Sequence, residues 1–224
     1  MVLPARGRLS FPDPRDFDRE GLLAVGGDLS AERLLLAYRS GIFPWYAEGL
    51  PPMWWSPDPR AVFDPDGLHV SRSLARVLRR GDFELRWNTA FRDVMRACCE
   101  GREDGTWILP EMIEAYARLH AAGHAHSLEV WRGAELVGGA YGVQVGGLFA
   151  AESMFHRRTD MSKVAVVALV RSLFAAGIEL LDVQMPTDHL RSLGCRTLPR
   201  RDYLALLPAA TTRVVALADL QPRL

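Results

Sequence analysis

Residues 126–155 read HSLEVWRGAELVGGAYGVQVGGLFAAESMF. Apolar and polar residues alternate over 126–132, a glycine follows at position 133, and this pattern predicts a β-strand that ends in a turn. The runs 135–145 and 147–155 predict a hairpin across Gly146 and Gly147. We therefore expect an antiparallel meander of three strands in this part of the chain.

A helix and a further strand are predicted after this meander. We expect Ser162 to cap a long apolar helix that ends at Gly177, and IELLDVQM (178–185) to form a buried strand. Further helices are predicted over 71–80, from Asn88 or Thr89 to Gly101, from Pro110 to Gly123, from Thr187 or Asp188 to Gly194, and over 201–207. The order predicts an α+β fold with a mixed, mostly antiparallel sheet, in which one helix crosses over between strands.

The N-terminal part of the chain has a different composition. It is rich in proline, glycine and tryptophan, and Ser30 is positioned to cap a short helix through Tyr38. The prolines between positions 44 and 59 exclude a long helix or a central strand there. We expect a small, loop-rich domain over residues 1–62 and a larger domain over 63–224.

Overall composition excludes several classes of protein. The 224 residues carry 27 Lys+Arg and 27 Asp+Glu, so the net charge of zero excludes a uniformly basic surface for nucleic acid. Lys163 is the single lysine. The three cysteines include no C-x-x-C pair, which argues against a zinc site and for a reducing compartment. With no run of signal-peptide or membrane-spanning length, we expect a soluble, cytoplasmic protein.

Motifs of covalent catalysis and metal binding are missing. The sequence contains no G-x-S-x-G, H-E-x-x-H or phosphate-binding G-x-x-x-x-G-K motif. Cys98 falls on the inward face of a predicted helix, where a structural role is expected. His120, His124 and His126 surround a helix end, and local hydrogen bonding is favoured over metal binding. No metal is expected.

Tryptophans and arginines suggest contacts with a nucleic acid. Loop tryptophans can stack on bases, and we expect this role for Trp45 and Trp107, whereas Trp54 and Trp55 are expected to hold the N-terminal domain in place. Each arginine cluster alone is more often a solvated face, but together they predict a local track for a polyanion. The residues are Arg72, Arg76, Arg79 and Arg80 in one cluster, and Arg191, Arg196, Arg200 and Arg201 in the other.

The meander, crossover helix and strand resemble the GNAT acyltransferase fold. Acetyltransferases of that fold hold the CoA pyrophosphate with a glycine-containing turn before the crossover helix. The corresponding stretch here, FHRRTDMSKVAV (155–166), contains no glycine. This departure argues against acetyl-CoA and leaves open an acyl group that arrives on another carrier.

Ten ordered motifs between about residues 10 and 205 resemble the leucyl/phenylalanyl-tRNA–protein transferase family. They are GLLAVGGDLS, GIFPWY, WWSPDPR, EGREDGTWI, GHAHSLEVW, ELVGGAYGV, ESMF, LLDVQ, DHLRSLG and PRRDY. The resemblance implies a cytoplasmic enzyme, without metal or CoA, that moves Leu or Phe, and Met less well, from aminoacyl-tRNA to proteins with N-terminal Arg or Lys. The product carries an N-terminal degradation signal. It also implies a small N-terminal domain joined to a GNAT-like domain, and a monomer is the expected state.

The same resemblance implies roles for single residues. It places the catalytic pair on Asp182 and Gln184, with Gln184 accepting the proton and Asp182 assisting. Because an amide is a very poor base, we expect Gln184 mainly to orient the amine and Asp182 to stabilise the developing ammonium. Glu152 would pair with the acceptor's cationic terminus, or with Arg157 in a purely structural role. The apolar pocket maps onto Ala140, Phe149, Met154 and Leu169, and Trp45 and Trp107 would hold the terminal adenosine.

Two other functions compete with this one. A CoA-dependent acetyltransferase of the GNAT type would share the fold, and the missing glycine turn counts against it. An RNA-binding module without catalysis would use the same arginines, but it would leave the polar strand LLDVQ (180–184) without a purpose.

Overall fold

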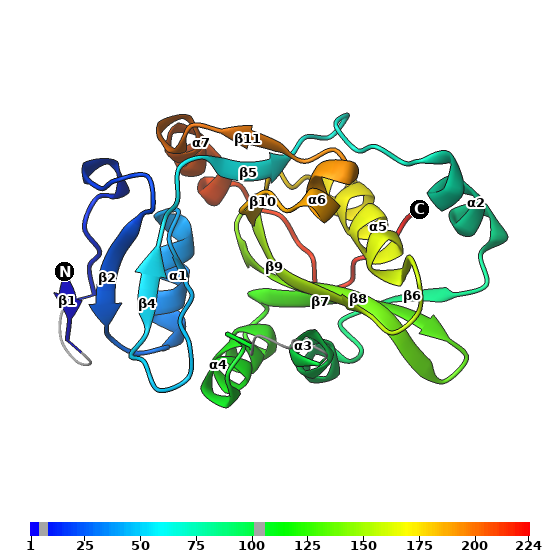
Figure 1. Ribbon diagram of the computed structural model, residues 1–224, viewed down its shortest axis with the longest axis horizontal. Coiled ribbons are helices and arrows are strands. Elements are labelled where there is room, and N and C mark those ends of the chain that lie inside the picture. The colour runs from blue at the N-terminus through cyan, green and yellow to red at the C-terminus, as the bar shows by residue number, and fades with distance from the viewer. Residues whose placement is uncertain (5–8, 101–105) are drawn as a thin grey trace.

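The computed structural model describes residues 1–4, 9–100 and 106–224, and it contains two sheets (Figure 1). The larger has the strand order β11-β5-β10-β9-β8-β7-β6 and the smaller the order β1-β2-β4-β3. The larger sheet consists of β5 (Arg60–Phe63), β6 (Glu84–Trp87), β7 (Ala125–Arg132), β8 (Glu135–Val145), β9 (Leu148–His156), β10 (Leu180–Gln184) and β11 (Arg196–Leu198). The smaller consists of β1 (Val2–Leu3), β2 (Leu22–Gly26), β3 (Phe43–Pro44) and β4 (Met53–Trp55).

Seven α-helices and one short 3-10 helix lie in the described part of the chain. They are η1 (Pro14–Asp16), α1 (Ala31–Arg39), α2 (Arg72–Arg80), α3 (Phe91–Cys99), α4 (Pro110–Ala121), α5 (Met161–Ala175), α6 (Asp188–Ser192) and α7 (Arg200–Thr212). Helices α3 and α4 cover one face of the larger sheet and α5 covers the other (Figure 1). Among the described residues, no helix combines the length and apolar character needed to cross a membrane.

The predicted meander and crossover are confirmed. Strands β7, β8 and β9 pair antiparallel in sequence order, and Gly146 turns the β8–β9 hairpin with a φ of 62°. Helix α5 then returns the chain so that β10 pairs parallel to β9, as a crossover connection requires. The remaining pairs of the sheet are antiparallel, so the expected mixed, mostly antiparallel α+β fold is present.

Most predicted helix starts are confirmed because they depend on local signals. The side chains of Ser30, Ser71 and Thr187 each accept a hydrogen bond from the first turn of α1, α2 and α6, and Pro110 is the first residue of α4. The predicted end of the α3 segment at Gly101, and positions 101–105 of the EGREDGTWI motif, lie outside the described residues.

Three predicted boundaries were wrong. Asn88 and Thr89 do not cap α3, since Ala90 precedes it and the Glu129 carboxylate of β7 accepts the backbone N–H groups of Thr89 and Ala90 instead. Helix α5 begins at Met161, so Ser162 lies inside it. Helix α7 runs from Arg200 to Thr212 and contains Pro208, which makes it longer than the predicted 201–207.

One hydrophobic core joins the two sheets. It includes Leu23 and Trp54 of the smaller sheet together with Tyr116 of α4 and Tyr203 of α7. Strand β5 crosses the domain boundary that the sequence suggested at residue 62, and all four of its residues belong to the larger sheet. The small sheet is therefore held rigidly against the end of the large one, where β5, β10 and β9 lie.

Candidate active site

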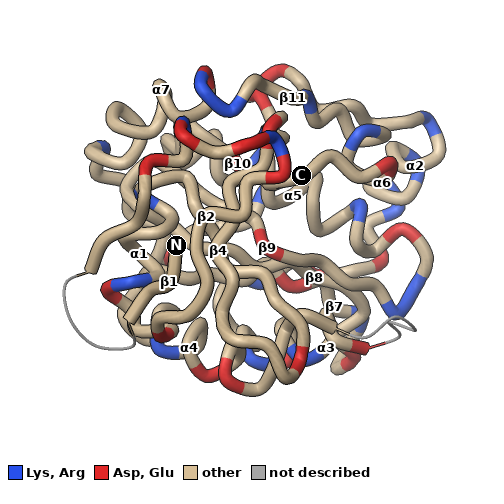
Figure 2. Tube along the Cα trace, turned by 60° about the vertical axis from the view of Figure 1, so that its left-hand side comes forward, with Lys and Arg blue, Asp and Glu red and all other residues tan. Residues whose placement is uncertain are grey.

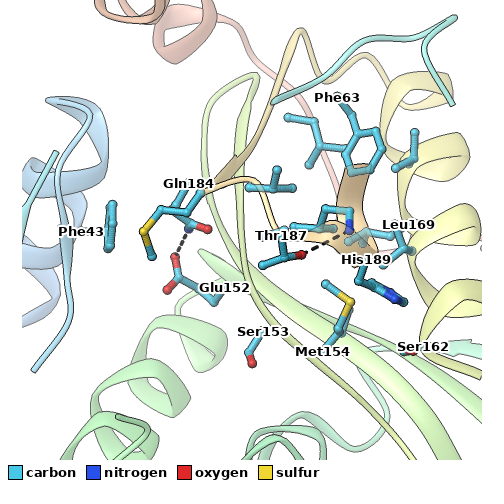
Figure 3. Close-up of a pocket in the computed structure, with 18 of the residues that line it drawn as sticks. Phe43, Phe63, Glu152, Ser153, Met154, Ser162, Leu169, Gln184, Thr187 and His189 are labelled. Carbon is cyan, nitrogen blue, oxygen red and sulfur yellow. Dashed lines mark hydrogen bonds between the residues drawn. The ribbon is translucent and has the colours of Figure 1, made fainter. Parts of the chain in front are cut away.

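A cavity of about 560 Å³ opens where β9 and β10 stop pairing. The parallel register runs from Leu180 opposite Leu148 to Asp182 opposite Ala150. Beyond that point the two strands part, and Glu152 of β9 and Gln184 of β10 face each other across the gap (Figure 3). Helices α5 and α6, strands β3, β5 and β8 and the segment before α4 also contribute to the walls. The volume lies in the range of small-molecule sites.

Seven of the nine predicted catalytic and substrate-binding residues line this cavity. Those that do are Trp45, Trp107, Ala140, Glu152, Met154, Leu169 and Gln184. Phe149 is not among the lining residues and is fully buried in the core. It is paired with Leu181 of β10, which does line the cavity, so the role of Phe149 in the pocket stays a prediction.

Further lining residues were not predicted. Val166 and Val170 of α5 join Leu169 at helical spacing, so the apolar face of this helix was a usable signal. The polar members had no sequence signal, since only the fold brings together the parts of β9, α5 and α6 from which they come. They are Ser153, His156, Ser162, Thr187 and His189, and the Nε2 atom of His189 has no hydrogen-bond partner among the described residues.

Trp54 and Trp45 differ in exposure, as their predicted positions require. Trp54 is fully buried, and its indole N–H donates to the Gly26 carbonyl at 2.8 Å. Trp45 stands at the mouth of the cavity with 41% of its surface exposed. The indole N–H of Trp55 donates to the Trp45 carbonyl at 2.6 Å, and the two rings meet edge to face with centroids 5.8 Å apart. Trp55 thus holds Trp45 by a hydrogen bond and a ring contact.

Asp182 lies beneath the cavity in a buried ion pair. Its carboxylate accepts two hydrogen bonds from Arg60, from Nε at 2.9 Å and from Nη2 at 2.6 Å, and both side chains are 1% exposed. The Tyr203 hydroxyl donates to it at 2.9 Å. Arg60 also donates to the Gly41 carbonyl at 2.9 Å and lies over the rings of Phe43 and Tyr203. This cluster ties β5, β10, α7 and the segment before β3 together.

Gln184 leaves the regular strand geometry. Its φ is 55°, and the pairing of β10 with β5 shifts register between Asp182 and Gln184. A non-glycine residue in this region costs about 1–3 kcal/mol. Regular strand alternation would put the side chains of Asp182 and Gln184 on one face. Here it is interrupted, because Gln184 lines the cavity while Asp182 points to Arg60 and Tyr203.

Glu152 faces the cavity with an altered acidity. The side-chain amide of Gln184 donates to its Oε1 at 2.9 Å. Burial, and secondarily the Asp182 carboxylate, raise the pKa of Glu152 to about 8, against the opposing effects of Tyr38 and Arg60. The alternative ion pair with Arg157 is not formed, since Arg157 binds Glu100. A carboxyl group with a pKa shifted this far is a candidate functional group.

The two arginine clusters differ once the fold is known. Arg72, Arg76 and Arg79 are exposed on α2 and form no ion pair with a described residue, while Arg80 contacts Asp82. Figure 2 marks the basic positions along α2 in blue. Arg191 of α6 is likewise exposed and unpaired within the described chain.

The rest of the second cluster is neutralised or buried. Arg196 and Arg201 pair with Asp64 and Asp202. Placing Arg200 in a tRNA-binding surface was wrong: only 6% of it is exposed, and its guanidinium donates to the carbonyls of Ser56 and Phe17, so it holds α7 to the smaller sheet.

The three predicted histidines do not converge. His120 bonds to the Ala125 carbonyl at 2.8 Å, and His126 lies between Asn88 and Gln144. Across residues 1–4, 9–100 and 106–224, no group of three His, Cys, Asp or Glu side chains is placed to bind a metal ion.

Comparison with known proteins identifies relatives over most of the chain. The family described as leucyl/phenylalanyl-tRNA protein transferase matches residues 62–208, and the N-terminal domain of that family matches 27–58. A curated protein of that name from Anaeromyxobacter sp. (strain Fw109-5) is 55% identical, over 92% of this chain and 88% of its own. Another, from Chromobacterium violaceum, is 57% identical over 91% and 85%. A solved structure of L-PGS from Bacillus licheniformis aligns at 11% identity with a TM-score of 0.41, over 74% of this chain and 53% of that one.

Removing the buried carboxylate is expected to destabilise the fold. Asp182→Ala leaves the Arg60 charge buried without its partner, and we expect the free energy of unfolding to fall by about 3–5 kcal/mol. Urea denaturation measures the free energy of unfolding of the variant and of the wild type. Asp64→Ala is the control, because it breaks the exposed pair with Arg196 on the adjacent strand and should cost at most about 1 kcal/mol. Equal losses for both variants would contradict the assignment.

Proposed function

This chain belongs to the leucyl/phenylalanyl-tRNA–protein transferase family, and on that basis we propose that it moves Leu or Phe, and Met less well, from aminoacyl-tRNA to the N-terminus of proteins that begin with Arg or Lys. The observation that carries the proposal is the mainly apolar cavity that places Glu152 and Gln184 side by side next to Trp45. The product would carry an N-terminal degradation signal. We propose a monomeric, cytoplasmic enzyme.

The proposed reaction needs alignment more than activation. The donor is an amino-acid ester, which is already reactive, and the acceptor α-amine has an ordinary pKa of about 7.7–8.0, so a good fraction is neutral near that pH. Attack of the amine on the ester carbonyl forms the amide bond and releases the tRNA hydroxyl. Holding the two groups in register can lower the barrier by about 7–11 kcal/mol. No protein nucleophile is required.

We assign the cavity residues accordingly. The apolar wall formed by Ala140, Met154 and Leu169 takes the amino-acid side chain, and Trp45 and Trp107 hold the terminal adenosine. Because the amide nitrogen of Gln184 is engaged by Glu152, its carbonyl oxygen is the group that accepts a hydrogen bond from the amine. Glu152 pairs with the cationic terminus of the acceptor.

We place the tRNA on the unpaired arginines. Arg72, Arg76 and Arg79, with Arg80 beside them, lie on α2, which packs against α5 (Figure 1). Arg191 lies on α6, which lines the cavity. Arg201, which is exposed next to Asp202, is a peripheral member. Arginine forks suit phosphate oxygens, and a local patch is sufficient on a protein with no net charge.

A transfer assay tests the function. Labelled Phe-tRNA or Leu-tRNA is incubated with the protein and a peptide that starts with Arg, and label is expected in the peptide. Gln184→Ala should lower kcat by about 10²-fold, because the amine loses its orienting acceptor. The control peptide starts with Asp and should stay unlabelled. Label from acetyl-CoA would support an acetyltransferase instead, and tRNA retention without transfer would support an RNA-binding module.

The salt dependence of tRNA binding tests the arginine patch. Replacing Arg72, Arg76 and Arg79 by Gln should weaken binding and reduce the slope of log K against log salt by about 2–3. The matched control replaces Arg92, Arg96 and Arg118, three exposed arginines on α3 and α4 across the sheet, and should leave the slope unchanged. An equal slope change in both triple variants would remove α2 from the interface.

The pH dependence of acceptor binding tests Glu152. Only the ionised carboxylate pairs with a cation, so binding weakens as pH falls below the raised pKa of about 8. For a peptide whose terminal arginine lacks the α-amino group, Kd should be about fivefold higher at pH 7 than at pH 8. Because this peptide has no α-amino group, protonation of that group cannot contribute to the pH dependence of Kd. Glu152→Gln should bind weakly at every pH, and a persisting pH dependence in that variant would contradict the assignment.

A further inference from the structure

We propose that Arg60 is a positioning residue for the transfer reaction, acting through Asp182 to hold the amide of Gln184 against Glu152. The proposal rests on the function proposed above and adds a residue outside the cavity. Arg60 lies on β5 with 1% of its side chain exposed, and it is not among the residues that line the cavity. It reaches the site through its hydrogen bonds to Asp182 and Gly41 and through its contact with the ring of Phe43.

The Asp182 carboxylate has no acceptor capacity left. Its Oδ1 accepts from Arg60 Nε and from the Gln184 backbone N–H, both at 2.9 Å. Its Oδ2 accepts from Arg60 Nη2 at 2.6 Å and from the Tyr203 hydroxyl at 2.9 Å. An ionised carboxylate offers about four lone-pair positions, and these four donors occupy them. Asp182 is therefore placed to hold its neighbours rather than to take a proton from the amine.

The conformation of Gln184 depends on this carboxylate. Its backbone N–H donates to Asp182 Oδ1 at the register shift between β10 and β5, and its φ of 55° accompanies a side chain that points toward Glu152. From there its Nε2 donates to Glu152 Oε1 at 2.9 Å. A left-handed conformation at glutamine persists only where surrounding contacts enforce it. The contacts that enforce it here start at Arg60.

Arg60 also connects this unit to the cavity mouth. Its Nη1 donates to the Gly41 carbonyl at 2.9 Å, and its guanidinium lies 4.9 Å from the ring centroid of Phe43, a cavity-lining residue. A planar guanidinium makes the bidentate contact, the Gly41 contact and the ring contact at once, and an ammonium does not. The substitution Arg60→Lys therefore keeps the charge and removes the geometry.

The test compares two equally buried arginines. Arg33 is also 1% exposed, pairs with a single carboxylate, that of Asp28, and donates to one carbonyl, that of Pro4, but it lies on α1 and lines no part of the cavity. Arg60→Lys and Arg33→Lys are assayed for peptide transfer at a temperature at which both are folded. We expect Arg60→Lys to lower kcat at least tenfold, with KM for tRNA and for peptide within twofold of wild type, because misalignment of about 1 Å costs about 10²-fold in rate. Arg33→Lys should leave kcat within twofold.

A milder variant covers the case in which Arg60→Lys does not fold. Tyr203→Phe removes one of the four donors to Asp182, and it should lower kcat three- to tenfold without changing either KM. An unchanged kcat in Arg60→Lys or in Tyr203→Phe, or an equal loss of kcat in Arg33→Lys, would overturn the positioning role. Failure of the wild-type chain to transfer would reject the proposed function and this role with it, whereas an active wild type with unchanged variants rejects the positioning role alone.

Discussion

The parting of β9 and β10 after Asp182 is the constraint on which the site depends. Parallel strands that stayed paired would fill the space with backbone hydrogen bonds, and no cavity would exist. The left-handed turn at Gln184 ends the pairing with β9, and the Arg60–Asp182 ion pair holds the resulting bulge on its other side. Helix α5 crosses beneath the opening and supplies the apolar wall. Glu152 and Gln184 are thus positioned by the register shift and the end of strand pairing in the sheet rather than by a loop.

Buried charge is used sparingly and in two different ways. Asp182 is fully compensated by Arg60 and Tyr203, so its energetic cost is offset within the fold. Glu152 accepts a hydrogen bond from Gln184 but forms no ion pair with a described residue, and burial raises its pKa to about 8. The first arrangement stabilises the fold, and the second leaves a carboxyl group with a shifted pKa in the cavity. Carboxyl groups with strongly shifted pKa values are frequent at functional sites.

Local patterns in the sequence predicted the elements, and non-local contacts decided the details. Ser71 and Gly81 delimit α2, and the glycine pair at 146 and 147 turns the hairpin, because such signals act within a few residues. The cap of α3 by Glu129 joins segments about 40 residues apart, and the Arg60–Asp182 pair spans 122 residues, so spacing could not reveal either. The motifs supplied seven of the residues that line the pocket, whereas most of the other lining residues are brought there only by the fold. The burial of Arg200 likewise depended on how α7 packs.

The link from Arg60 to Gly41 has a further consequence for the mouth of the cavity. The Gly41 carbonyl precedes β3, and β3 leads directly to Trp45, whose own carbonyl is held by Trp55. The floor and the rim of the cavity are therefore connected by hydrogen bonds that form without a ligand. Little conformational entropy remains to be lost on association, so a larger share of the contact energy is retained as affinity.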